Sequence, residues 1–196
     1  MPNFSTMPEV FVSNADLAVA VSREVKLGRL RKIGSRLYTR NLKEQPERLV
    51  QRNLWPLVDA YLSGALIADR TALENRPAVD GSVFLIADHK RDIALPGVTL
   101  RPRKGPVALE TDRPFIGSLR LASPARAFLE NMRPSRARSG VARTLSRREI
   151  EERLDEILRQ SGAPAIQRLR DDARQVANQL GMTDEFQNLD TLIGSL

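Results

Sequence analysis

The sequence contains no cysteine, and this absence excludes several classes of chemistry. Without thiols there is no disulfide framework, no thiolate nucleophile, and no zinc or iron–sulfur site with cysteine ligands. A chain without cysteine also suits a reducing compartment. We therefore expect a cytoplasmic protein.

Long apolar runs and glycine-rich phosphate loops are missing as well. No stretch approaches the roughly 18 uninterrupted apolar residues of a membrane-spanning helix. The N-terminus lacks the basic segment and apolar run of a signal peptide, and neither standard phosphate-binding glycine motif occurs. Apolar residues nevertheless make up 41% of the 196 residues, which is enough for a folded core. We expect a folded protein with no membrane association, no cofactor and no metal.

The positive charge of the chain is unevenly distributed. The formal net charge is +7. Residues 1–43 contain eight basic and three acidic residues, whereas residues 44–132 are nearly neutral. Residues 133–148 contain six arginines and no acid, and residues 149–196 contain five basic and ten acidic residues. This asymmetry indicates a polyanionic partner or attraction between segments of the chain.

One helix is predicted in the N-terminal region. Positions 13 and 14 carry a start signal, Ser-Asn. Leu17, Val21 and Val25 then repeat at i, i+4 and i+8 and, with Ala18 beside them, form one apolar stripe. Gly28 follows where a glycine commonly ends a helix. Three polar residues lie off the stripe and are expected to face outward: Ser22, Arg23 and Lys26.

A β-hairpin is predicted directly after this helix. Gly34 and Ser35 are typical of the two central residues of a type II′ turn. In that register Arg31 pairs with Tyr38, and the two faces of the hairpin differ because side chains alternate along a strand. The face expected to point outward carries Arg29, Arg31, Ile33, Arg36, Tyr38 and Arg40. The face expected to pack on the helix carries Leu30, Lys32, Leu37 and Thr39.

The rest of the chain predicts a mixed α/β unit and a helical C-terminal segment. Pro46 begins a helix that Pro56 should break near Trp55. After residue 148, three helical patterns are separated by Gly162 and Gly181. The other expected elements are strands at residues 83–87 and 116–121, a turn at Pro96-Gly97 and a helix at 124–132.

The expected fold class is α+β, with four segments along the chain. They are a reduced winged-helix domain over residues 1–43, a small mixed α/β domain over 44–132, an arginine-rich linker over 133–148 and a C-terminal helical segment over 149–196. The linker is interpreted as flexible and solvated, with contact to DNA or to the acidic tail as the alternatives. The C-terminal helices are interpreted as intramolecular core, with homodimerisation as the alternative.

The N-terminal pattern predicts contact with DNA. In a winged helix, one helix enters the major groove while the following hairpin lies along the phosphates. Each cation that neutralises a phosphate releases a counterion, which offsets the mutual repulsion of clustered cations. The alternative is a solvated hairpin with scattered arginines, which the charge alone does not exclude. The residues expected to contact DNA are Ser22, Arg23, Lys26, Arg29, Arg31, Lys32, Arg36, Tyr38 and Arg40.

The run SNADLAVAVSREVKLGRLRKIGSRLYTR resembles the N-terminal winged-helix domain of AbiEi-like antitoxins, the transcriptional regulators of type IV toxin–antitoxin systems. Gly28, Gly34 and Tyr38 occupy places that match the family's pattern. The later runs LIADRTALEN and VFLIAD look like the family's strands and its S/T-A-L helix. The resemblance implies a regulator that represses its own operon and neutralises a toxin, typically a nucleotidyltransferase. The helices that normally precede the recognition helix are missing or reduced to residues 1–12.

The whole chain is also similar to the N-terminal part of some bacterial Fic (cell filamentation) proteins, whose downstream domain transfers AMP to protein hydroxyls. The similar features are the basic front, the stretch NMRPSRARSGVARTLSRREIEERL and the helical tail. The HPFxxGNGR-type loop of the transferase does not occur in the sequence. This resemblance therefore implies the alternative function of a regulatory module that binds a protein partner. Under both interpretations we expect no enzymatic activity.

Two constellations of polar residues carry weaker hypotheses. His89, the single histidine, lies between Asp88 and Lys90 and has the residue types of a general base beside a carboxylate. A polar turn after a strand explains the same residues. Acids at positions 69, 74, 80 and 88, with Lys90, have the residue types of a nuclease with two carboxylates and a lysine, but their spacing is not distinctive. We therefore expect no catalytic residue and no metal ligand.

Overall fold

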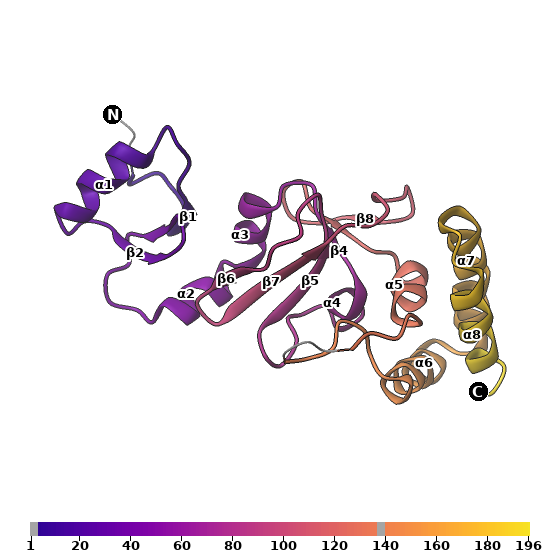
Figure 1. The fold of residues 1–196 in the computed structure, drawn as a ribbon. Coiled ribbons are helices and arrows are strands. Elements are labelled where there is room, and N and C mark those ends of the chain that lie inside the picture. Colours follow the sequence, from indigo (N-terminus) through magenta and orange to yellow (C-terminus); the bar gives the residue numbers. More distant parts are fainter. Residues whose placement is uncertain (1–3, 137–139) are drawn as a thin grey trace.

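The structure, a computed structural model, describes residues 4–136 and 140–196. These residues form eight helices and nine strands, so the α+β class is confirmed. The molecule is elongated, with an N-terminal unit at one end, three C-terminal helices at the other and a six-stranded sheet between them (Figure 1). In the described part of the chain, no helix has both the length and the apolar character needed to cross a bilayer.

The N-terminal unit combines one helix with a three-stranded antiparallel sheet in the order β1-β3-β2. Its elements are β1 (Val10–Val12), α1 (Ala18–Lys26), β2 (Arg31–Gly34) and β3 (Leu37–Thr39). The predicted apolar stripe is confirmed for Val21, which is buried, and for Leu17 and Val25, which pack beside it, but Ala18 is exposed. Gly28 follows the helix with a φ of +69°, a left-handed conformation that glycine adopts without strain.

Both faces of this sheet are covered. On one face, Phe11 and Tyr38 pack under α1 with their ring centroids 6.2 Å apart. On the other face, Val10 and Leu37 join the main core formed with α2 (Pro46–Arg52) and α3 (Leu54–Tyr61). The N-terminal unit therefore shares its core with the α/β unit.

The predicted register and sidedness of the hairpin are wrong. Lys32 pairs with Tyr38 and Gly34 pairs with Leu37, with a bulge between the two pairs. The turn consists of Ser35 and Arg36, and Arg36 has a φ of +53°. The sheet faces two cores, and this register packs the half-buried Tyr38 ring under α1 and buries Leu37 in the main core. Since a shift of one residue exchanges the faces of a strand, the predicted outward face does not exist.

The α/β unit contains a mixed sheet in the order β6-β7-β5-β4-β9-β8. β4 is parallel to β9 and β5 is parallel to β7, whereas the other neighbours are antiparallel. The Pro96-Gly97 turn is confirmed between β6 and β7, but only residues 120 and 121 of the second expected strand are extended. After α3, the elements of the α/β unit are β4 (Leu66–Ile67), α4 (Asp69–Glu74), β5 (Ser82–Ile86), β6 (Ile93–Leu95), β7 (Val98–Arg103), β8 (Arg113–Pro114), β9 (Arg120–Leu121) and α5 (Pro124–Asn131).

The break between α2 and α3 follows from the position of a proline. α2 ends at Arg52 and α3 begins at Leu54, with Asn53 between them. A proline ring clashes with the carbonyl four residues earlier, and for Pro56 that residue is Arg52. The predicted break is confirmed, but it lies before Trp55 at the position that this clash dictates.

The three predicted C-terminal helices are confirmed as α6 (Arg147–Ser161), α7 (Ala163–Leu180) and α8 (Thr183–Ile193). Gly162 and Gly181 separate them, both with positive φ. The helices pack on α5 through a core that includes Phe128, Leu154 and Leu189. They therefore extend the α/β unit rather than form a detached tail.

The arginine-rich segment is only partly solvated. Thr144 and Leu145 are buried, and Arg143 donates a hydrogen bond of 2.7 Å to the buried carboxylate of Asp69. The interpretation of residues 133–148 as a flexible linker is therefore wrong for its second half, because Leu145 joins the core and Arg143 pairs with a buried carboxylate. Arg133 pairs with Glu185 of α8, as the alternative interpretation of contact with the acidic tail expected. Arg138 lies outside the described residues.

Candidate nucleic-acid interface

One face of α1 and of the turn before it is exposed along its whole length. Residues 15, 18, 19, 22, 23 and 26 follow the i, i+3, i+4, i+7 spacing of a single helix face, and all are exposed. Ala18, Val19, Ser22, Arg23 and Lys26 line a shallow hollow of about 500 Å³. The face therefore combines an apolar half near the N-terminus of the helix with a cationic half near its C-terminus.

The cations of this face are not neutralised by the protein itself. In the described part of the chain, no hydrogen bond or ion pair engages the side chains of Arg23, Lys26 or Lys32. Lys32 pairs with Tyr38 across the hairpin, so it lies on the α1 side of the sheet. Arg29 is 69% exposed and lies 3.5 Å from Glu24, a loose pair that a stronger anion can replace. Five of the expected DNA contacts therefore lie on the α1 side of the unit: Ser22, Arg23, Lys26, Arg29 and Lys32.

The remaining four expected contacts are engaged by the protein. Arg31 points to the opposite side of the sheet and donates a hydrogen bond to the carbonyl of Glu44. Arg40 is exposed, but its guanidinium donates to the carbonyls of Ser5 and Met7. Tyr38 packs under α1. These three side chains hold the unit together, and none of them projects from a free wing.

The tip of the hairpin is attached to the α/β unit. The Tyr61 hydroxyl donates a 2.5 Å hydrogen bond to the carbonyl of Ser35, and the Arg36 guanidinium lies 5.8 Å from the centre of the Tyr61 ring. Burial raises the pKa of the Tyr61 hydroxyl, which keeps it protonated as a donor. The expected wing therefore points toward α3 rather than into solvent, and α1 is the element that the unit presents.

A charged junction fixes this unit to α2. The Arg52 guanidinium lies 2.8 Å from carboxylate oxygens of both Glu9 and Glu44. Hydrogen bonds from Asn41 and Arg52 lower the pKa of Glu9, and hydrogen bonding to Arg52 lowers the pKa of Glu44. The two acids are thus occupied by Arg52 at the junction and are not paired with the cations of α1.

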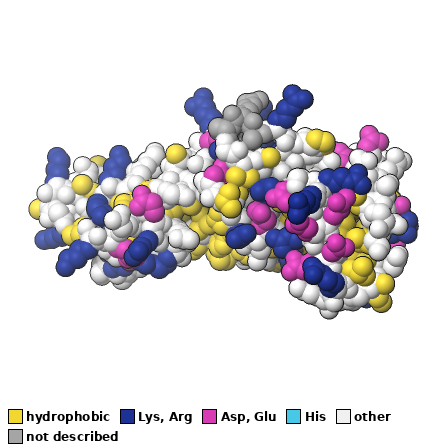
Figure 2. Space-filling view, turned by 90° about the horizontal axis from the view of Figure 1, so that it is seen from below, with side chains coloured by type: hydrophobic (Ala, Val, Ile, Leu, Met, Phe, Trp, Pro, Cys, Tyr) yellow, Lys and Arg dark blue, Asp and Glu magenta, His cyan; other side chains and the backbone are white. Residues whose placement is uncertain are grey.

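The charge pattern agrees with this assignment at the scale of the surface. Lys and Arg side chains gather around the N-terminal end in Figure 2, whereas basic and acidic side chains alternate over the C-terminal half. Arg147 with Glu151, and Arg148 with Glu152, are examples of such neutralised pairs on α6. The N-terminal end is therefore the part of this face where cations are least compensated.

The acids that suggested a nuclease are dispersed in the structure. Asp69 is buried between Arg103 and Arg143. Asp80 accepts hydrogen bonds from the backbone of Ser82 and Val141, and Asp88 pairs with a lysine at position 104. Among the described residues, no three His, Asp or Glu side chains are arranged to hold a metal ion.

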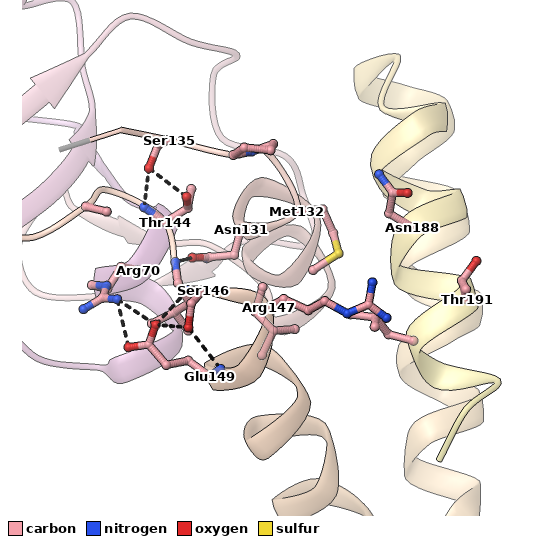
Figure 3. A pocket seen from close by; sticks show the side chains of 15 residues that line it. Arg70, Asn131, Met132, Ser135, Thr144, Ser146, Arg147, Glu149, Asn188 and Thr191 are labelled. Atoms are coloured by element: carbon pink, nitrogen blue, oxygen red, sulfur yellow. Dashed lines mark hydrogen bonds and ion pairs between the residues drawn. The ribbon is translucent and has the colours of Figure 1, made fainter.

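A separate pocket of about 560 Å³ lies between the end of α5, the start of α6 and α8 (Figure 3). Met132, Leu145 and Leu192 supply apolar lining. In Figure 3 Asn188 and Thr191 lie on α8, across the pocket from the hydroxyls of residues 135, 144 and 146. Arg70 is tied to Glu149 at 2.9 Å, and Ser146 and Glu149 cap α6 reciprocally. The polar groups of the wall are thus largely satisfied by one another.

The apolar half of the α1 face is the feature that our sequence analysis missed. Polarity selected Ser22, Arg23 and Lys26, whereas Ala18 was expected beside the buried apolar stripe and Val19 was given no role; Ala18 is in fact exposed. The periodicity that places the polar residues outside also places these two outside, so the signal was present. Comparisons of the chain with protein-family models, with curated proteins and with solved structures find no match.

Proposed function

We propose that the chain is a cytoplasmic, non-enzymatic regulator that binds double-stranded DNA through the exposed face of α1. The observation that carries this proposal is the combination of exposure and unpaired charge on that face. Arg23 and Lys26 project from it without a protein partner among the described residues, beside Ser22. Arg29 and Lys32 extend the same positive side beyond the helix.

The width of the major groove favours double-stranded DNA over double-stranded RNA as the partner. A helix with its side chains is about 10–12 Å wide, and the major groove of B-DNA is about 12 Å wide. The corresponding groove of double-stranded RNA is deep and narrow and does not admit a helix. We therefore propose that α1 enters the major groove, with Arg29 and Lys32, which follow its C-terminal end, toward the phosphates.

A salt titration tests this proposal. The logarithm of the DNA affinity should fall linearly with the logarithm of salt concentration, and the slope reports the number of phosphates neutralised. The double variant Arg23→Ala plus Lys26→Ala should weaken binding and reduce the slope by about two. The double variant Arg159→Ala plus Arg168→Ala removes the same charge from exposed positions on α6 and α7 and serves as the control. Equal effects of the two double variants would show that net charge, and not α1, is responsible.

The resemblance to antitoxins adds a protein partner to the proposal. We propose that the chain represses its own operon and neutralises a toxin of the nucleotidyltransferase type. The pocket between α5, α6 and α8 supports this, because it gives a partner a recess of about 560 Å³ far from α1 (Figures 1 and 3). Co-expression with the product of the neighbouring reading frame, followed by purification with nuclease treatment, tests it. Recovery of a Fic domain in place of a nucleotidyltransferase would favour the alternative of a regulatory module for AMP transfer.

A further inference from the structure

We propose that Val19 recognises the methyl group of a thymine in the major groove, so that α1 discriminates thymine from other bases at one position of its site. This inference rests on the proposed binding of DNA by α1 and specifies what that helix recognises. It assigns a role to the apolar half of the face, for which contacts between cations and phosphates give no reason.

The position of Val19 carries the inference. Its side chain is 83% exposed, although α1 has a buried stripe on its opposite side. A single exposed apolar residue is common and needs no explanation by itself. Val19, however, lies one helical turn from Ser22 and Arg23 and lines the same hollow. Any duplex that contacts those two residues therefore also approaches Val19.

The chemistry of the major groove determines the partner of this side chain. The base edges in that groove present hydrogen-bond donors and acceptors, and the C5-methyl group of thymine is their apolar feature. An isopropyl group gains nothing from facing a donor or an acceptor, and it desolvates those groups without pairing them. Contact with a methyl group removes apolar surface of both partners from water. Ala18, next to Val19, is small enough to leave the base edge accessible.

The charges on the same face favour DNA over a protein as the occupant. Arg23 and Lys26 follow the apolar half along the same helix face and have no partner among the described residues. An apolar protein surface would bury these two cations without compensation, which is unfavourable. A duplex brings phosphates to the cations and a base edge to Val19 in a single arrangement.

Removal of the methyl group from the DNA provides the test. A high-affinity duplex is first selected with the full chain from a pool of random 20-base-pair duplexes. The selected duplex is then synthesised with deoxyuridine at each thymine position in turn, which deletes one methyl group and leaves base pairing intact. We expect the unmodified chain to bind one of these substituted duplexes about fourfold more weakly than the parent, with an unchanged salt slope.

The variant Val19→Ala should bind the parent duplex and that substituted duplex equally, and alanine at an exposed helix position favours folding. Val79→Ala, which alters a valine that is 90% exposed outside α1, is the control and should retain the fourfold difference. If the unmodified chain binds every substituted duplex as tightly as the parent, or if Val19→Ala retains the difference, this inference is wrong while the proposed function stands. If no duplex is selected, both are wrong.

Discussion

At the scale of single residues, Arg126 of α5 shows how a buried charge is held by several partners. It is fully buried, and its guanidinium lies 2.7 Å from Asp112 and 3.0 Å from Glu130. It also donates hydrogen bonds to the carbonyls of Pro106 and Val107. Burial raises the pKa of the Glu130 carboxyl, and the neighbouring Arg126 and Arg103 oppose this shift. Arg126 thus attaches the loop before β8 to α5.

Loss of this side chain should be severe. Arg126→Ala leaves the buried carboxylate of Asp112 without a cation and leaves Glu130 with Arg103 alone, at 3.5 Å. We therefore expect the free energy of unfolding in urea to fall by about 3–5 kcal/mol. Arg148→Ala is the matched control, since that side chain is 87% exposed and pairs with Glu152 at the surface. It should change the free energy of unfolding by less than about 1 kcal/mol. Similar losses for the two variants would contradict the assignment.

Two substitutions of Tyr38 distinguish a structural role of this side chain from a contact with DNA. Tyr38→Phe should leave both stability and DNA affinity unchanged, because the ring packs beside Phe11 under α1. Tyr38→Ala should reduce the free energy of unfolding by about 2 kcal/mol, less than for a fully buried ring because Tyr38 is only half-buried. Weaker DNA binding by Tyr38→Phe at unchanged stability would restore the wing contact that the sequence analysis expected.

At the scale of elements, the junction between β1 and α2 depends on ionised carboxylates. The pKa of Glu9 and that of Glu44 are lowered in the folded protein by hydrogen bonds to Arg52 and, for Glu9, to Asn41. Because the folded value lies below the ordinary value of 4.5, the contribution to stability is fully present above that value. It is lost as the pH falls through the folded pKa.

This linkage gives a pH-dependent prediction. Arg52→Met should lower the melting temperature at neutral pH, and its difference from the unmodified chain should shrink between about pH 5 and about pH 3. Arg48→Met alters an exposed arginine of the same helix and is the control; its melting temperature should follow that of the unmodified chain. A difference for Arg52→Met that stays constant over this pH range would exclude the two glutamates as its cause.

Local signals were sufficient for some elements and insufficient for others. The three C-terminal helices were predictable because Gly162 and Gly181 interrupt otherwise regular apolar periodicity. The hairpin register was not predictable from its turn residues, because the bulge before Gly34 depends on which core receives Tyr38 and which receives Leu37. Periodicity identified the exposed side of α1, and it contains no information about the attachment of the hairpin tip to Tyr61.

At the scale of the whole molecule, the four predicted segments are joined by shared cores. Val10 and Leu37 of the N-terminal unit pack with residues of α2 and α3. At the other end, α5 contributes to the core of the C-terminal helices. Asp69 and Arg143, which are 74 positions apart in sequence, meet in the interior. No pattern within a short window reveals such a pair, which is why the arginine-rich segment was interpreted as a linker.

Sharing of cores predicts that the segments are not separable. A chain of residues 44–196 lacks the sheet that covers part of α2 and α3, so apolar residues such as Leu49 and Leu57 would lose part of their cover. We expect this chain to melt at a lower temperature than residues 1–196 and to associate on size-exclusion chromatography. A monomeric fragment with the melting temperature of the full chain would instead indicate independent domains.

The hydrogen bond between Tyr61 and Ser35 affects the orientation of α1 as well as stability. Since the hairpin is hydrogen-bonded at its tip and packed on both faces, we expect α1 to keep one orientation relative to α3. A duplex bound by α1 would therefore fix the orientation of the whole elongated molecule relative to the DNA axis (Figure 1). A partner bound beside α8 would then lie at a fixed distance from the DNA and in a fixed orientation to it.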